Sequence, residues 1–177
     1  MIKSGIYLNP RIAILFICLL MINCGELTEE LDDSLAFKLE PEFQTISMNN
    51  EASISLNVQN LTQPIFAMTM QVNYSSSILS FNDLTGFSVG GFFGSQNVVF
   101  VVEENSIIYI AMSIQQGNSE VDGSGTIVTL TFKGSSTGTS EIELSLSDLH
   151  FFDSAGNEMS VGDFEIVPAM ITVTSLR

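Results

Sequence analysis

The sequence has few basic, histidine and cysteine residues and no tryptophan, and each shortage argues against a class of function. Its 177 residues contain 5 Lys and Arg against 20 Asp and Glu, which gives a formal net charge of −15. Nucleic-acid binding requires Lys and Arg to displace counterions from phosphates, and charge-driven docking on an anionic membrane requires them as well. The composition therefore argues against a nucleic-acid-binding protein and against a protein that docks on an anionic membrane by charge alone.

Catalytic residues are also scarce. Two Cys and one His are too few for a Cys/His zinc site, and a Ser-His-Asp triad would have to use His150. His150 lies between Leu149 and Phe151 near the end of an alternating run, where a packed or surface residue is the ordinary interpretation. No G-x-S-x-G elbow precedes a helical segment. We therefore expect no enzyme activity, no cofactor and no metal centre.

Two loops have a superficial likeness to calcium sites. The segment from Asn118 to Gly123 has oxygen-bearing side chains at positions 1, 3 and 5 and Gly at position 6. An EF-hand needs a bidentate Glu at position 12, which is Thr129 here. The segment from Asp153 to Asn157 is typical of a hairpin turn. Gly-rich turns are the favoured interpretation of both, with a weak calcium site as the open alternative.

The first 23 residues are predicted to be a signal peptide of the lipoprotein type. Lys3 and Arg11 supply positive charge, and an unbroken apolar run of 11 residues follows from Ile12 to Ile22. A transmembrane helix needs about 20 such residues. Cys24 comes directly after, which resembles the lipidated first residue of mature bacterial lipoproteins. We expect lipidation at Cys24 and a bacterial cell-envelope location; the alternative is a plain signal peptide that is cut a few residues later.

Residues 24–43 are predicted to form an acidic tether. Seven acidic residues and one base, Lys38, lie between Glu26 and Glu42, and such a run repels itself into an extended chain. Removal of the leader also removes Cys18 and leaves Cys24 as the one cysteine. No intramolecular disulfide can then form, so the remaining domain must be held by its core.

Residues 44–175 alternate between apolar and polar side chains with period two. Such alternation puts one set of side chains on a core face and the other on an outer face of a strand. Turn signals such as Asp122-Gly123-Ser124-Gly125 separate the runs, and no sustained helical stripe appears. The sequence therefore predicts one all-β domain, an antiparallel β-sandwich. The runs are Ile54–Gln59, Phe66–Tyr74, Val98–Val102, Ile107–Ser113, Val128–Phe132, Glu141–Ser147 and Ile171–Thr174.

The order of these segments resembles the bacterial cohesin domain, the module of scaffolding proteins that captures dockerin modules. Phe66-Ala67-Met68-Thr69-Met70-Gln71-Val72-Asn73-Tyr74 leads into Ser76-Ser77-Ile78-Leu79-Ser80-Phe81, where the family typically has Asp-Pro-x-Val-Leu-x-Phe. Ser75 and Ser76 stand in place of the usual Asp-Pro. Gly123 to Lys133 resembles the family's G-x-G-x-[IL]-x-x-[IL]-x-F segment. The resemblance implies a jelly roll of about nine strands.

The resemblance also implies a non-catalytic module whose partner is a dockerin-like protein that holds its own calcium, such as a dockerin-bearing polysaccharide-degrading enzyme. Cohesins bind the partner on one sheet. Transferred to this sequence, the outward residues of that sheet are Thr69, Gln71, Asn73, Val99, Val101, Tyr109, Ala111, Glu141, Glu143 and Ser145. Small polar groups around a Tyr resemble an interface with an aromatic anchor and a polar rim. An ordinary solvated sheet face is the alternative, and both phases of Val98–Val102 and Ile107–Ser113 are apolar.

Carbohydrate binding is the main competing function, and a structural envelope lipoprotein is a further alternative. Polysaccharide-binding faces commonly stack sugars on exposed Trp and Tyr rings. The sequence has no Trp, and Tyr74 falls on the apolar phase of its strand. Phe87, Phe92 and Phe93, which flank Gly90-Gly91, are expected to plug a loop; as an exposed platform they would favour polysaccharide binding instead.

Overall fold

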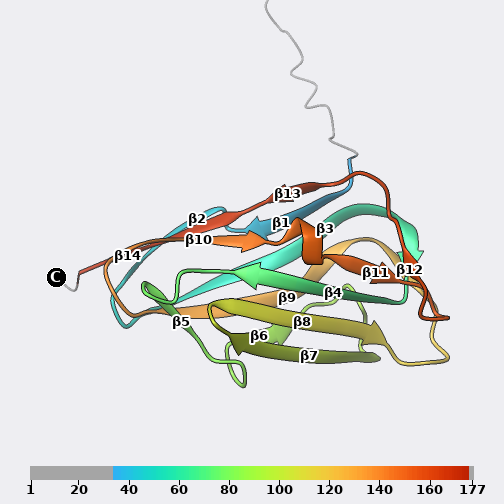
Figure 1. The fold of residues 1–177 in the computed structure, drawn as a ribbon, viewed down its shortest axis with the longest axis horizontal. Coiled ribbons are helices and arrows are strands. Elements are labelled where there is room, and N and C mark those ends of the chain that lie inside the picture. Colours follow the sequence, from blue (N-terminus) through green and yellow to red (C-terminus); the bar gives the residue numbers. More distant parts are fainter. Residues whose placement is uncertain (1–33, 176–177) are drawn as a thin grey trace, which may run out of the picture. The chain divides into compact units, whose positions relative to one another are not determined.

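A computed structural model describes residues 34–175, in which fourteen strands and one short 3-10 helix are connected by turns (Figure 1). No helix in this range is long and apolar enough to cross a membrane. The elements are β1 (Ala36–Glu40), β2 (Phe43–Ser47), β3 (Glu51–Ile65), β4 (Ala67–Asn73), β5 (Leu79–Phe81), β6 (Phe87–Val89), β7 (Asn97–Glu104), β8 (Ile107–Ile114), β9 (Val121–Gly134), β10 (Gly138–Leu144), η1 (Leu146–Asp148), β11 (His150–Phe152), β12 (Glu158–Met159), β13 (Glu165–Val167) and β14 (Ala169–Thr174).

The strands form two sheets, which confirms the predicted β-sandwich. One sheet has the order β13-β1-β3-β9-β5, with β6 also paired to β9. In the other, β4 pairs with β8 along one edge and with β11 and β10 along the other, and β7 lies beyond β8. Strands β14 and β2 continue this sheet past β10. Most pairs are antiparallel, but β1–β13 and β2–β14 are parallel. The strand number exceeds the expected nine because several strands are pieces of two or three residues.

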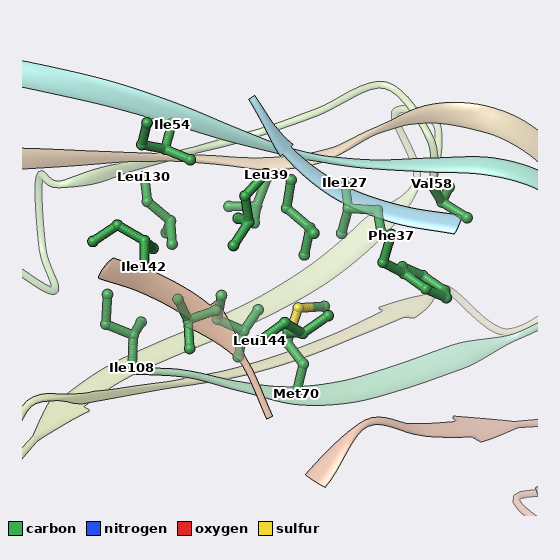
Figure 2. Packing of buried hydrophobic residues seen from close by; sticks show 14 of the residues in the cluster. Phe37, Leu39, Ile54, Val58, Met70, Ile108, Ile127, Leu130, Ile142 and Leu144 are labelled. Atoms are coloured by element: carbon green, nitrogen blue, oxygen red, sulfur yellow. The ribbon is translucent and has the colours of Figure 1, made fainter. Parts of the chain in front are cut away.

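The core lies between the two sheets and explains the period-two pattern. Figure 2 shows Ile54 and Leu130 of one sheet above Ile108, Met70 and Ile142 of the other. Each of these five side chains is at most 2% exposed. Burial of this kind contributes about 1.5–3 kcal/mol for each large apolar side chain. The alternating apolar residues are therefore the inner faces of the two sheets.

The domain begins earlier than the sequence indicated, so the predicted boundary between residues 43 and 44 is wrong. Phe37 and Leu39 are buried in the core, and β1 pairs with β3 and β13. Lys38 and Glu40 point the other way, and Glu40 Oε2 accepts a 2.7 Å hydrogen bond from Asn57 Nδ2. Alternation does not reveal this strand, because its outward residues are the charged Lys38 and Glu40 and it directly follows an acidic run. The predicted signal peptide, Cys24 and the first part of the tether lie outside the described residues.

Candidate binding face

Four strands bring the predicted binding residues onto one outer surface. Strands β7, β8 and β4 are paired in continuous register, and β11 extends the sheet beside the first half of β4. Because side chains alternate across a strand, cross-strand partners share a face. One row on the outer face runs Phe100, Ala111, Thr69, His150, and the next runs Val102, Tyr109, Gln71. We call the outer face of β7, β8, β4 and β11 the binding face.

A hollow of about 280 Å³ lies on the binding face between these two rows. A second, apolar hollow of about 200 Å³ lies next to it and shares Thr69, Phe100 and Ala111. Phe100 is 62% exposed and borders both hollows. An exposed aromatic ring between two depressions is the kind of feature that anchors a protein interface. The first hollow is lined by Thr69, Met70, Gln71, Phe100, Tyr109, Ile110, Ala111, Asp148 and His150.

Asp148 fixes the polar side of the first hollow. Its Oδ1 accepts a 2.9 Å hydrogen bond from Gln71 Nε2, and its Oδ2 accepts hydrogen bonds from the hydroxyls of Ser145 and Ser147. These two hydroxyls, and to a smaller extent the charge of His150, lower the pKa of Asp148 below its usual value. The hollow therefore presents an ionised carboxylate with an oriented Gln71 amide beside it.

His150 is a half-exposed surface residue, as expected, and is paired with Glu158 rather than with a Ser in a triad. Its Nδ1 lies 2.6 Å from Glu158 Oε1 of β12. The pair ties β11 to β12 at the edge of the sheet and sets the orientation of the imidazole ring that lines the first hollow.

Most of the predicted face residues do point outward. Thr69, Gln71 and Asn73 of β4 alternate with buried neighbours, and Tyr109 of β8 is 36% exposed. Glu143 of β10 pairs with Asn73 and extends the outer surface toward β10. Ala111, Glu141 and Ser145 also lie on the outer side.

The prediction was wrong for β7, where Val99 and Val101 were expected to face outward. Val101 is only 9% exposed and Val99 packs against the core, whereas Val98 and Phe100 are 55% and 62% exposed. All five residues of the run are apolar, so hydropathy alone does not define the strand phase. The two-residue turn at Asn105-Ser106 could have defined the phase of β7 relative to β8. It places Glu104 opposite Ile107, and hence Val102 opposite Tyr109.

The aromatic residues considered for sugar stacking are mostly buried. Phe92 and Phe93 are 9% and 2% exposed and pack edge to face with 5.3 Å between ring centroids, which confirms the loop plug. Tyr74 is 8% exposed, and its hydroxyl donates a 3.1 Å hydrogen bond to Glu103 Oε1. Burial, reinforced by the Glu103 carboxylate, raises the pKa of Tyr74 to about 12. These rings therefore do not form an exposed platform.

The two loops considered for calcium are built as turns. Asp153 Oδ2 accepts a hydrogen bond from Asn157 Nδ2, and Asp153 Oδ1 accepts hydrogen bonds from the backbone N–H groups of Asn157 and Ala155. These bonds, first of all the one from the Asn157 side chain, lower the pKa of Asp153. Val121 already begins β9, so the Gly-rich segment after Asn118 runs directly into a strand. Within residues 34–175, no group of three or more His, Cys, Asp or Glu side chains is placed to hold a metal ion.

The fold and this surface define a β-sandwich binding module. The sequence matches the family model of the cohesin domain over residues 47–164, and the chain belongs to the cohesin domain family. The family consists of non-catalytic protein-binding modules. No curated protein matches the sequence.

Solved cohesin structures share the fold at low sequence identity. A type I cohesin–dockerin complex from Clostridium thermocellum is 15% identical, with a TM-score of 0.63 over 81% of this chain and 95% of that chain. A non-cellulosomal cohesin from Archaeoglobus fulgidus is 10% identical, with a TM-score of 0.62 over 80% and 92%. A type II cohesin from the cellulosome of Acetivibrio cellulolyticus is 14% identical, with a TM-score of 0.63 over 78% and 95%.

Proposed function

We propose that the binding face captures a dockerin-like protein module. The observation that carries the proposal is the pair of hollows beside Phe100, bordered by Tyr109 and by the oriented Gln71–Asp148 pair. Protein interfaces combine aromatic anchors with a polar rim in this way. Several similar structures are cohesins in complex with dockerins, which supports the same partner class here. The partner we propose is a dockerin-bearing polypeptide such as a polysaccharide-degrading enzyme.

The face suits a protein partner better than a polysaccharide. Sugar stacking uses flat exposed rings, and on the binding face the exposed rings are Phe100 and the partly exposed Tyr109. Phe100 and Tyr109 lie in the two cross-strand rows of the binding face, next to the small side chains of Thr69 and Ala111. A protein module can fill the depressions between these residues with its own side chains.

A capture experiment tests this proposal. The immobilised domain is incubated with a lysate of the source organism, with calcium or with chelator, and bound polypeptides are identified by mass spectrometry. A dockerin folds around calcium, so we expect a dockerin-bearing polypeptide that is captured in calcium and lost with chelator. Calcium-independent recovery of polysaccharide without protein would contradict the proposal.

Single substitutions then locate the contact. Tyr109→Ala and Phe100→Ala should each weaken capture by about 1–4 kcal/mol, as expected of an interface anchor. Gln71→Ala should weaken it by removing the polar contact at the hollow. Phe43→Ala is the matched control, because Phe43 is 74% exposed but lies on the distant strand β2. Equal capture by all four variants would place the partner on another surface.

We also propose that the module is displayed on the cell envelope through a lipid on Cys24. The apolar run before Cys24 and the acidic residues after it support an anchor followed by a spacer. Several acyl chains hold a protein on a membrane firmly, whereas one chain holds it marginally. Cys24→Ala should move the protein from the membrane fraction to the soluble fraction. A variant that stays with membranes, or a wild-type protein that is already soluble, would contradict the anchor.

A further inference from the structure

Strand β7 forms an open edge of the larger sheet. Among residues 34–175 its pairing partner is β8 alone. Gln96 and Gln115 form a hydrogen-bonded pair through Gln115 N and Gln96 O. In an antiparallel ladder such pairs recur every second residue, so Val98 and Phe100 also bond to β8. The backbone groups of the intervening residues, Asn97, Val99, Val101 and Glu103, therefore point away from β8 along the open edge.

This edge has few of the devices that usually block strand pairing. Proteins protect edge strands with charged side chains, Pro, bulges or very short strands, and the charged residues of β7, Glu103 and Glu104, are confined to one end. Asn97–Glu104 has eight residues, contains no Lys, Pro or Gly, and follows β8 without a register shift. The other strands at sheet edges within the described range have five residues or fewer, and β13, β5 and β6 have three. The edge of β7 is thus the longest open template for another strand.

The charges of β7 favour a second copy in one particular alignment. When two copies pair antiparallel about Phe100, all four open-edge residues of each copy find partners. Glu103 then lies opposite Asn97 of the other copy, and Glu104 opposite Gln96. Glu103 Oε1 already accepts hydrogen bonds from the Tyr74 hydroxyl and the Ser106 backbone N–H, so Glu103 Oε2 is the atom that would meet the Asn97 amide. The two Phe100 rings meet across the two-fold axis, where aromatic pairs stabilise a sheet. Parallel pairing in register would instead place acidic residues against acidic residues.

We propose that the chain forms a two-fold symmetric dimer in which the β7 strands of two copies pair antiparallel and join their larger sheets. The interface is isologous, because each copy uses the same edge. Tyr109, Gln71 and His150 stay uncovered by the backbone pairing, whereas Phe100 lies at the two-fold axis and belongs both to the dimer contact and to the binding face. The dimer therefore presents two binding faces on one continuous sheet. Repulsion between two acidic domains opposes the contact, and we expect dimerisation to strengthen as salt screens it.

Charge substitutions at Asn97 test the dimer and its register. Sedimentation velocity of residues 25–177 over a concentration series measures the dimer dissociation constant. Asn97→Glu places like charges opposite Glu103 twice and should weaken the dimer by about 2- to 30-fold, whereas Asn97→Lys should strengthen it by a similar factor. Asn118 is the matched control for Asn97. In each of these two residues the side-chain amide donates a hydrogen bond to the backbone carbonyl three residues earlier. Asn118→Glu and Asn118→Lys change the net charge identically but lie in a different loop.

Amide hydrogen exchange supplies a second readout. The amides of Val99 and Val101 should gain protection as the protein concentration rises, while those of Val98 and Phe100, already bonded to β8, should not change. A monomer at the highest soluble concentration would overturn the proposal. So would a dimer on which the Asn97 variants act like their Asn118 counterparts, or protection of Val99 and Val101 that does not depend on concentration.

Discussion

We predict that Phe37 contributes a large part of the unfolding free energy of the sandwich, although it lies in a segment with the composition of a tether. Its side chain is 1% exposed, stacks on Phe151 at 5.7 Å between ring centroids and meets Phe164 edge to face at 5.3 Å. Replacing a buried Phe with Ala costs about 3–5 kcal/mol. Domains of this kind unfold at a cost of about 5–15 kcal/mol, so Phe37→Ala should remove a fifth or more of the total.

Urea unfolding of residues 25–177, followed by far-UV circular dichroism, measures this loss. The native spectrum should show β-structure with little helix. Lys38→Ala is the control, because Lys38 is the next residue of β1 and points to the opposite side. We expect that variant to change the unfolding free energy by less than about 0.5 kcal/mol. If Phe37→Ala costs less than about 1 kcal/mol, β1 does not belong to the cooperative core and the reasoning fails.

Two further predictions concern a close backbone contact and a buried phenol. A Cβ at Gly90 would lie 2.0 Å from the carbonyl oxygen of Thr126, whereas a Cβ at Gly91 meets nothing within 4 Å. Gly90→Ala should therefore lower the urea midpoint by an amount equivalent to about 1–3 kcal/mol, and Gly91→Ala should leave it unchanged. Equal midpoints for the two variants would refute the contact. Because the pKa of Tyr74 is raised to about 12, the folded protein keeps the phenol proton to higher pH than the unfolded chain, and stability should fall as pH rises from about 10 toward 12. Unfolding at about pH 9 and pH 11 should show a smaller fall for Tyr74→Phe, and an identical fall would refute this assignment.

The sequence predicted the sandwich well because burial of one strand face imposes period two. Ile54, Met70 and Ile142 were recognisable as core residues from alternation alone, and all three are buried. The same argument failed where alternation was masked. In β1 the outward residues are charged and merge with the preceding acidic run, and in β7 both faces are apolar. Hydropathy defines a phase only when the two faces of a strand differ.

The chemical detail of the binding face was less accessible from the sequence. Gln71 and Tyr109 were placed correctly because their strands alternate or are paired in a simple register. The bond between Gln71 and Asp148 joins residues 77 positions apart and depends on how η1 turns beside β4. Such a contact is fixed by tertiary packing rather than by local pattern, so composition and periodicity contain no signal for it.

The pairing of β2 with β14 has a consequence for the order in which the domain folds. Phe43–Ser47 has no strand partner in the described range other than β14, and it lies beside residues 170–174 at the far end of the chain (Figure 1). Contacts between residues so distant in sequence form slowly, because the entropy cost of closing a long loop comes before any stabilisation from the contact. During synthesis β2 therefore stays without its strand partner until β14 has been made. Loss of β14 would leave both β2 and β10 with an open edge, so β14 is the strand that joins β2 to the larger sheet.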